Sequence, residues 1–244
     1  MSPICPTSRP VDHRVSPGRS VRWRRRGAFT RTDLLVVVLA TLVVTTLVLA
    51  PVKAARSEAG RQVCAGNLQR VAEAVQLFAE EHESVLPGLH ATGSGASWWW
   101  YKEEVKGYVG LHGPSSAKDL AFACPMDRGY SDPGPFWQNP RFDYGSYVFN
   151  GVTLDESPNI AGWSLSAVSE PDRTLLVMEW TAHAPLSWHR SRTGRANAPF
   201  YRDAESVVAF ADGHVDFIKI YFDGYNPAYT RDPLPGYDYR YSGN

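Results

Sequence analysis

An uncharged apolar run near the N-terminus restricts the fold of this chain more than any other feature of its sequence. Residues 34–52 contain no charged side chain and lie between Asp33 and Lys53. Their 19 positions approach the roughly 20 residues that a helix needs to cross the hydrocarbon core of a bilayer. Because an isolated segment in lipid can satisfy its backbone hydrogen bonds only as a helix, we predict one transmembrane helix over residues 34–52.

Charge is distributed unevenly around this run. The chain has 25 Lys+Arg and 25 Asp+Glu; residues 1–26 carry seven Arg and one Asp (+6), so the remainder carries 18 bases and 24 acids (−6). Basic residues favour the cytoplasmic side of a span, so we expect a cytoplasmic N-terminus and an acidic body across the membrane. An acidic body argues against nucleic-acid binding, which needs a basic surface.

Two simpler interpretations of the run leave some residues unexplained. A secretory signal peptide has a shorter apolar core followed by a small-residue cleavage site, and Pro51 at the end of this run disfavours that assignment. A plain membrane anchor accounts for the apolar residues and the arginines. It does not account for Asp33, a carboxylate directly at the edge of the span.

The residues around this carboxylate form a recognisable motif, Arg26-Gly27-Ala28-Phe29-Thr30-Arg31-Thr32-Asp33-Leu34-Leu35-Val36-Val37. It resembles the prepilin signal of type IV pilins and type II secretion pseudopilins. The resemblance implies that a prepilin peptidase cuts between Ala28 and Phe29, next to Gly27, and that the new N-terminus is methylated. It also implies that Asp33, in place of the family's Glu, pairs with the α-amino group of a neighbouring subunit and sets the register of a filament. The sequence departs from the family pattern at Ala28, where Gly is usual, and at Arg31 and Thr32, where apolar residues are usual.

Further motifs follow in a fixed order: Cys64-Ala65-Gly66-Asn67-Leu68, Cys124-Pro125-Met126-Asp127, residues 144–151 and Phe210-Ala211-Asp212-Gly213-His214-Val215. Their order resembles a pilin-like subgroup named for prepilin-type processing and an H-x9-D-G signature, although Arg202 stands where the signature has His. The resemblance implies an α+β fold in which a long N-terminal helix packs on an antiparallel β-sheet head. It implies prepilin peptidase and other pilin-like subunits as partners. It places the chain in a bacterial inner membrane as a single-pass protein, with the head in the periplasm or cell envelope.

Apolar periodicity extends the N-terminal helix beyond the span. The residues that recur at intervals of three and four are Val63, Leu68, Val71, Val75, Leu77 and Phe78, a pattern typical of an amphipathic helix. We expect a kink at Pro51 and an end near residues 81–83. The predicted organisation is a basic leader over residues 1–28, a helix over 29–84 and an extracytoplasmic α+β head over 85–244, with strands at 146–149, 174–179, 207–211 and 214–221 and a surface tail over 222–244.

The three cysteines divide between the leader and the body. Cys5 belongs to the leader, which leaves Cys64 on the helix and Cys124 in the head. We predict that Cys64 and Cys124 form a disulfide, which would close a long loop and add about 4 kcal/mol to stability. The alternative is two buried thiols. The chain has no CxxC pair, so neither a zinc ribbon nor a thioredoxin site is indicated.

Asp212 and Gly213 are expected to form a two-residue type I′ hairpin turn. That turn would place Phe210 opposite Val215 and Val208 opposite Phe217 on one apolar face. A metal or substrate site at Asp212, His214 and Asp216 is the alternative, and it offers too few ligands on one face of the hairpin. A second cation hypothesis is a calcium site formed by the loop carboxylates Asp127, Asp132 and Asp143, against which stands simple solvation of surface acids.

Two aromatic segments complete the candidates. Trp98-Trp99-Trp100-Tyr101, on a short helix expected over residues 97–109, could form an exposed sugar-binding surface. Packing against the N-terminal helix and under the loops of residues 111–145 is favoured. Ser187-Trp188-His189 is expected in a loop near Arg190 and Arg192, and no hydrolase, metalloprotease or phosphate-binding motif accompanies it. We therefore predict a structural subunit without enzymatic activity. The alternative is an anchored, non-polymerising domain that binds a ligand such as carbohydrate.

Overall fold

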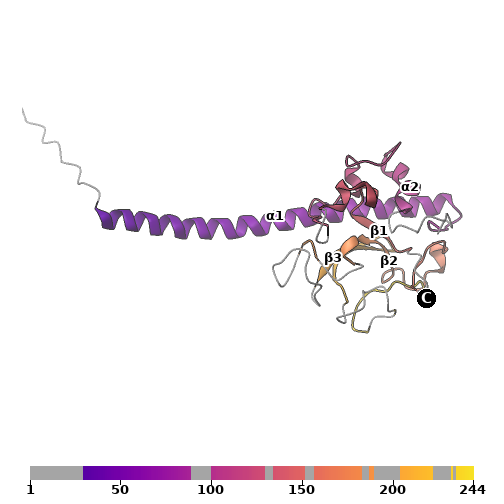
Figure 1. The fold of residues 1–244 in the computed structure, drawn as a ribbon. Helices are drawn as coiled ribbons and strands as arrows, with labels where there is room; N and C mark the ends of the chain where they lie inside the picture. Colours follow the sequence, from indigo (N-terminus) through magenta and orange to yellow (C-terminus); the bar gives the residue numbers. More distant parts are fainter. Residues whose placement is uncertain are drawn as a thin grey trace, which may run out of the picture. The chain divides into compact units, whose positions relative to one another are not determined.

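The computed structural model describes residues 30–88, 100–129, 134–151, 157–182, 187–189, 204–221, 232 and 235–244 (Figure 1). The chain divides into two units, residues 1–48 and 49–244. Helix α1 (Arg31–Glu81) runs through this division and continues past Pro51, which lies inside it. Its end agrees with the end expected from the apolar periodicity. The boundary between units lies within α1 because the second half of the helix packs into the head.

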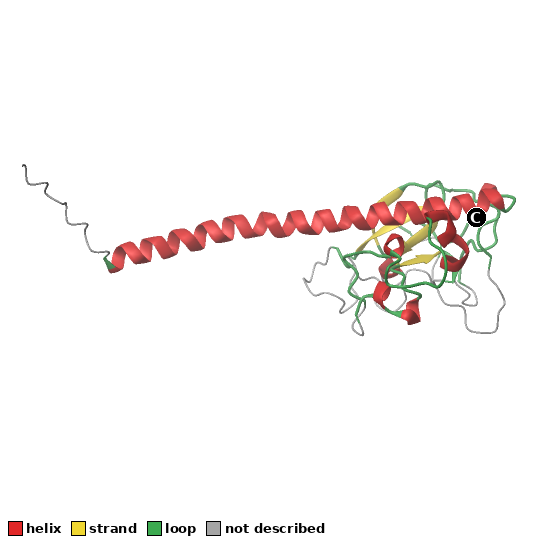
Figure 2. Ribbon diagram, turned by 90° about the horizontal axis from the view of Figure 1, so that it is seen from above, coloured by secondary structure: helices red, strands yellow, loops and turns green. Residues whose placement is uncertain are grey.

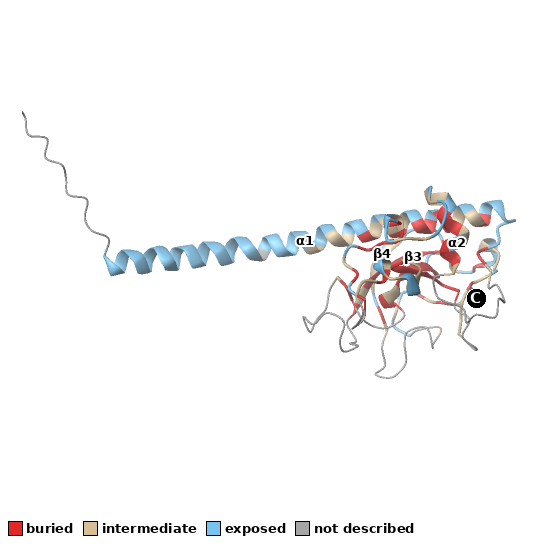
Figure 3. Ribbon diagram, turned by 45° about the horizontal axis from the view of Figure 1, so that its top comes forward, coloured by how far each residue is buried: buried red, intermediate tan, exposed pale blue. Residues whose placement is uncertain are grey.

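The first part of α1 exposes its apolar side chains all round. Leu34, Val38, Leu42 and Leu47 are between 47% and 69% exposed, and Figure 3 shows this part of the helix in pale blue. The hydroxyl of Thr41 donates to the carbonyl of Val37 at 2.7 Å, and Thr45 and Thr46 make equivalent bonds within the helix. A surface of this kind, with its polar groups satisfied internally, suits a hydrocarbon environment. By length and composition, α1 is able to cross a membrane.

The second part of α1 buries one face. Cys64, Leu68, Val71, Val75 and Ala79 are completely buried and recur at intervals of three and four residues, the spacing of a helical stripe. They belong to the larger of two apolar clusters, which lies between the helix and the sheet. Val63 and Leu77, also expected in this stripe, are 51% and 44% exposed, because they lie on the side of the helix away from the cluster. Figure 2 shows this part of α1 running along the sheet of the head.

The sheet is an antiparallel meander of four strands in the order β1-β2-β3-β4. Its strands are β1 (Tyr147–Phe149), β2 (Leu175–Glu179), β3 (Glu205–Phe210) and β4 (Val215–Lys219). All four lie within a few residues of their expected positions. The α+β class predicted from the sequence is therefore observed. Every residue of β2 is buried, because the larger cluster covers one face of the sheet and a second cluster covers the other.

Part of the C-terminal segment belongs to the core, which corrects the expectation of a surface tail. Tyr239 and Tyr241 are at most 2% exposed and lie in the second cluster. The carbonyl of Arg240 accepts from the backbone N–H of Leu175 at 3.0 Å, and its N–H donates to the carbonyl of Arg173 at 2.9 Å. An extended segment places alternate residues on the same side, so the two rings enter the core together.

The β3–β4 hairpin has a different register from the one expected. Ala209 lies opposite Val215 and Val207 opposite Phe217, one residue away from the predicted pairs. The backbone N–H of Gly213 donates to the carbonyl of Phe210 at 2.9 Å. Of the loop residues, only Gly213 has a positive φ, at 96°, whereas a type I′ turn needs a positive φ at Asp212 as well. The loop therefore has three residues, and the shift places Val207 and Ala209, rather than Val208 and Phe210, on the α1 side.

Candidate functional site

Asp33, which was expected to set the register between subunits, lies in the first turn of α1. The backbone N–H and the hydroxyl of Thr30 donate to Oδ2 of Asp33 at 2.9 and 2.8 Å, and the N–H of Asp33 donates to the Thr30 hydroxyl at 3.1 Å. This reciprocal pair is a capping box, so Asp33 stabilises the start of the helix within its own chain. Its role between subunits stays a prediction. The expected processing residues Gly27, Ala28 and Phe29 lie outside the described residues.

A disulfide joins α1 to the head at the two predicted cysteines. Cys64 is bonded to Cys124, 60 residues later, and both are completely buried. One turn along the helix, Nδ2 of Asn67 donates to the carbonyls of Leu120 and Ala123 at 3.0 and 2.8 Å. The Cys-x-x-Asn spacing therefore places a covalent bond and two hydrogen bonds on the same face of α1, where both hold one loop of the head.

Asp127 is a buried hydrogen-bond acceptor and not a surface acid. Its carboxylate accepts from the backbone N–H of Gly129 at 2.7 Å, from that of Phe136 at 2.9 Å and from the hydroxyl of Ser146 at 2.7 Å. The side chain of Ser146 also accepts from the N–H of Cys124 at 3.0 Å. Burial raises the pKa of the Asp127 carboxyl to about 6 despite these hydrogen bonds. The contacts tie the loop after Cys124 to the start of β1.

The three loop carboxylates proposed for calcium do not form a described cluster. Asp132 lies outside the described residues, and neither Asp127 nor Asp143 belongs to a described group of three converging ligands. The backbone carbonyl of Asp143 accepts instead from the ammonium of Lys102 at 2.5 Å. Lys102 is itself buried and pairs with Asp119 at 3.0 Å. The acids of this region therefore hold loops together.

The Asp-Gly turn is seated on the N-terminal helix. Nε2 of Gln69 donates to the carbonyl of Gly213 and Nε2 of Gln76 to that of Ala211, both at 3.1 Å. Nδ1 of His214 lies 2.6 Å from Oδ1 of Asp212. This pair is partly exposed, and among the described residues it belongs to no group of three potential metal ligands. The turn residues thus dock the hairpin on α1, a contact that the sequence analysis did not predict.

The aromatic segment before α2 (Tyr101–Val105) faces the interior where it is described. Tyr101 is completely buried. The ring of Trp100 meets that of Phe149 edge to face, with centroids 6.0 Å apart, and its indole N–H points to the carbonyl of Gly151 at 3.4 Å. Trp98 and Trp99, like Arg190, Arg192 and Arg202, lie outside the described residues. The described half of the segment has the packing role that was favoured over a sugar-binding surface.

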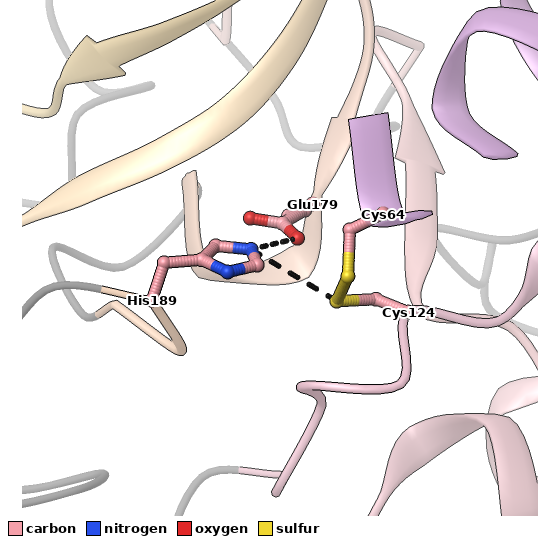
Figure 4. Close-up of side chains that lie close together, drawn as sticks. All are labelled: Cys64, Cys124, Glu179 and His189. Carbon is pink, nitrogen blue, oxygen red and sulfur yellow. Dashed lines mark hydrogen bonds and ion pairs between the residues drawn. A yellow bond between two sulfur atoms is a disulfide. The ribbon is translucent and has the colours of Figure 1, made fainter. Parts of the chain in front are cut away.

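A buried cluster joins the disulfide to two further side chains that the sequence analysis did not connect (Figure 4). Nε2 of His189 lies 2.7 Å from Oε1 of Glu179 and 3.9 Å from Sγ of Cys124. The side chain of Glu179 is completely buried and that of His189 is 2% exposed. Among the described residues, these two and the two cysteines are the one group whose potential ligand atoms converge, all within 4.8 Å of one another.

The surroundings of the cluster hold the imidazole and the carboxylate in fixed positions. Oε2 of Glu179 accepts from the backbone N–H of Val207 at 2.9 Å, and the N–H of His189 donates to the hydroxyl of Ser187 at 3.1 Å. Because an ionised carboxylate only accepts hydrogen bonds, we assign the imidazole proton to Nε2. Nδ1 is then buried without a partner among the described residues. In this oxidised state the sulfurs are bonded to each other, and no thiolate is present to act as a nucleophile or a ligand.

Two signals for this cluster were present in the sequence. Glu179 ends the otherwise apolar strand Leu175-Leu176-Val177-Met178, and a carboxylate in that place needs a buried partner. The second signal is Trp188 in the expected loop Ser187-Trp188-His189: it is 1% exposed, and its indole N–H donates to the carbonyl of Gly129 at 3.0 Å. Neither signal predicts that Glu179 and His189 contact each other and the disulfide.

Comparison with protein-family models, with curated proteins and with solved structures found no match for this chain. The structural class of the protein is therefore assigned from its fold and its site alone. It is an α+β protein with a four-stranded antiparallel sheet, and its N-terminal helix is long and apolar enough to span a membrane.

Proposed function

We propose that this chain is a pilin-like, membrane-anchored structural subunit that is processed by a prepilin peptidase and assembles with other pilin-like subunits. The observation that carries the proposal is the division of α1 (Arg31–Glu81) into two surfaces. Its first part exposes apolar side chains on all sides, while its second part buries a stripe against an antiparallel sheet. One helix that serves both lipid and a globular head is the architecture expected of a pilin-like subunit.

The short motifs that suggested the resemblance support the proposal through their contacts. Cys64 and Asn67 on the helix hold the loop before Asp127, and the hydroxyl of Tyr147 donates to the carbonyl of Cys64 at 2.9 Å. The Asp-Gly turn docks on the same helix through Gln69 and Gln76. The motifs therefore share one task, which is to fix the head to the helix that would carry load in a filament.

Asp33 has a second role in this proposal. After cleavage before Phe29, the free α-amino group would lie four residues from Asp33, at the same end of α1. A carboxylate there can pair with the α-amino group of a neighbouring subunit. Desolvation offsets most of the Coulomb energy of such a buried pair, so its main use is to select one register. With the head across the membrane from the basic leader, the chain would lie in a bacterial inner membrane.

The alternative of an anchored, non-polymerising carbohydrate-binding domain gains no specific support. It depended on an exposed aromatic surface, and Trp100 and Tyr101 have partners inside the head. The proposal assigns no catalytic step to this chain.

The N-terminal residue of the mature protein tests the proposal. The full chain, expressed in a bacterium that has a prepilin peptidase and recovered from its membranes, is expected to begin at a methylated Phe29 by mass spectrometry. An Ala28→Leu variant should keep its leader, because a bulky side chain replaces the small residue at the cut. A Gly18→Leu variant, changed within the leader but away from the junction, is the control and should be processed. Wild-type chain with an intact Met1 N-terminus would contradict the proposal.

A further inference from the structure

The buried cluster has a composition that a purely structural disulfide does not need. It brings two sulfurs, an imidazole and a carboxylate from four separate parts of the chain within 4.8 Å of one another. Two cysteines alone suffice to close the covalent link between α1 and the head. A completely buried Glu179 facing His189 costs desolvation and adds nothing to that link.

We infer that, when the disulfide is reduced, Cys64, Cys124 and His189 bind one zinc ion and Glu179 completes its coordination. Two thiolates, a neutral imidazole and a carboxylate form a four-ligand set of the kind that Zn²⁺ accepts in tetrahedral sites. The inference goes beyond the proposed structural role and does not depend on filament assembly.

The distances require only small movements. With Zn–S near 2.3 Å and Zn–N near 2.0 Å, tetrahedral coordination places sulfur and nitrogen about 3.6 Å apart; Sγ of Cys124 and Nε2 of His189 are 3.9 Å apart already. The imidazole and the carboxylate, now 2.7 Å apart, would separate to roughly 3.4 Å as the metal replaces the shared proton. The two sulfurs would move to about 3.8 Å by rotation of both side chains.

One outer contact, at Glu179, suits a bound metal. The backbone N–H of Val207 donates to Oε2 of Glu179, which leaves Oε1 facing the centre, and such outer contacts orient metal ligands. Nε2 of His189 also faces the centre, so the proton would move to Nδ1 when Nε2 binds the ion. His189 also lines a pocket of about 440 Å³ together with Glu58, Arg61 and Phe217, so one member of the cluster borders this pocket.

The two states exclude each other chemically. A dithiol reductant transfers two electrons and two protons to the Cys64–Cys124 bond, giving two thiols, and is itself oxidised to a disulfide. Zn²⁺ then displaces the two thiol protons and forms two Zn–S bonds. In the reverse reaction a disulfide oxidant accepts two electrons from the two thiolates and, with two protons, becomes a dithiol, while the Cys64–Cys124 bond forms again and the ion is released.

Cobalt spectroscopy on the full chain in detergent tests the inference. The disulfide is reduced with a water-soluble phosphine, which takes one oxygen from water and becomes a phosphine oxide, and Co²⁺ is then added. We expect a thiolate-to-cobalt charge-transfer band and the visible bands of tetrahedral Co²⁺ at one equivalent per chain, both lost when Zn²⁺ is added. The unreduced chain should show neither band.

Variants separate the ligands from their surroundings. His189→Ala and Glu179→Gln should each weaken Co²⁺ binding by about tenfold or more, and Cys124→Ser should weaken the charge-transfer band. His214→Ala is the matched control, because His214 also pairs with a carboxylate but lies outside the cluster, and it should bind as wild type does. Circular dichroism establishes that each reduced chain is folded.

Three results would overturn the inference. A folded, reduced wild-type chain could show no tetrahedral bands, or His189→Ala could bind Co²⁺ as tightly as wild type. The reduced chain could also unfold and bind no metal, which would show that no site persists without the disulfide.

Discussion

At the scale of single residues, the Asp127 carboxylate shows how one buried side chain organises a loop. Its oxygens accept hydrogen bonds from Gly129, Phe136, Trp137 and Ser146. Burial raises its pKa to about 6, because the desolvation of the charged form outweighs the hydrogen bonds. The same carboxylate that holds the loop therefore weakens the fold when it ionises.

This balance predicts a pH dependence of stability. The pKa of Asp127 is higher in the folded chain than its ordinary value of 3.8, so the folded state binds more protons between pH 4 and pH 6. Its contribution to the free energy of unfolding should therefore rise as the pH falls from 7 to 4, by up to about 3 kcal/mol. Urea unfolding of wild type and Asp127→Asn at both ends of this range measures the change.

The comparison has a control at an exposed position. Asp172→Asn changes a carboxyl group on the surface, and its effect should be small at both pH values. The prediction is wrong if the stability difference between wild type and Asp127→Asn is the same at pH 7 and pH 4.

At the scale of elements, the β3–β4 hairpin depends on a glycine for two reasons. Gly213 has a φ of 96°, which side-chain-bearing residues rarely adopt. A Cβ at this position would also lie 3.0 Å from Nε2 of Gln76 on α1. The residue thus sets the register of the hairpin and allows the turn to approach the helix.

Substitution of Gly213 should therefore lower the free energy of unfolding by more than the strain of its positive φ alone would. Gly213→Ala is expected to lower the free energy of unfolding by about 2–3 kcal/mol. Gly110 has a φ of 77° and open space around a new Cβ, so Gly110→Ala should lower the free energy of unfolding by about 1–2 kcal/mol. Thermal and urea unfolding measure both losses. Adding Gln76→Ala to Gly213→Ala should recover part of the excess, and equal losses for the two glycines would contradict a close contact with α1.

At the scale of the whole molecule, α1 meets two environments along one continuous helix. Leu42 and Val43 are 57% and 56% exposed in the apolar part, and Val63 and Leu77 are 51% and 44% exposed beside the head. These four side chains are alike in chemistry and exposure. What distinguishes them is the length of the uncharged run in which the first two lie.

The difference predicts unequal effects of charge. Leu42→Arg combined with Val43→Arg should release the chain from membranes, since each Arg at the centre of a span costs about 2.5–3.5 kcal/mol on insertion scales. Val63→Arg combined with Leu77→Arg is the matched control and should remain membrane-bound. Alkaline carbonate extraction followed by detection of the full chain distinguishes the two. Retention of both variants in the membrane would argue against a span over residues 34–52.

Local patterns in the sequence were sufficient to predict the positions of the long helix and of the strands. The apolar stripe over residues 63–78, the uncharged run and the apolar strands each depend on neighbouring residues, so their periodicity predicts helix and sheet directly. The sequence also left Cys64 and Cys124 as the two candidates for a disulfide, because Cys5 lies in the predicted leader, but it did not exclude two buried thiols; the bond is seen in the structure.

The register of the β3–β4 hairpin and the burial of the C-terminal segment depended on contacts between distant parts of the chain. The φ of Asp212 is negative, and the turn is hydrogen-bonded to Gln76 on α1, so the loop has three residues. The length of the loop in turn determines which side chains of β3 and β4 face α1. Spacing alone could not show this, because a shift of one residue reverses every side chain of a strand. The burial of Tyr239 and Tyr241 likewise depended on where the C-terminal segment could pair.

By itself, the sequence predicted an apolar N-terminal helix with an amphipathic continuation and an α+β head, and it left Cys64 and Cys124 as the two candidates for a disulfide between them. Only the tertiary structure decided that Glu179 and His189 meet that disulfide. The reason is physical: periodicity reports which face of an element is buried, whereas a cluster drawn from residues 64, 124, 179 and 189 depends on how four elements are positioned around one core.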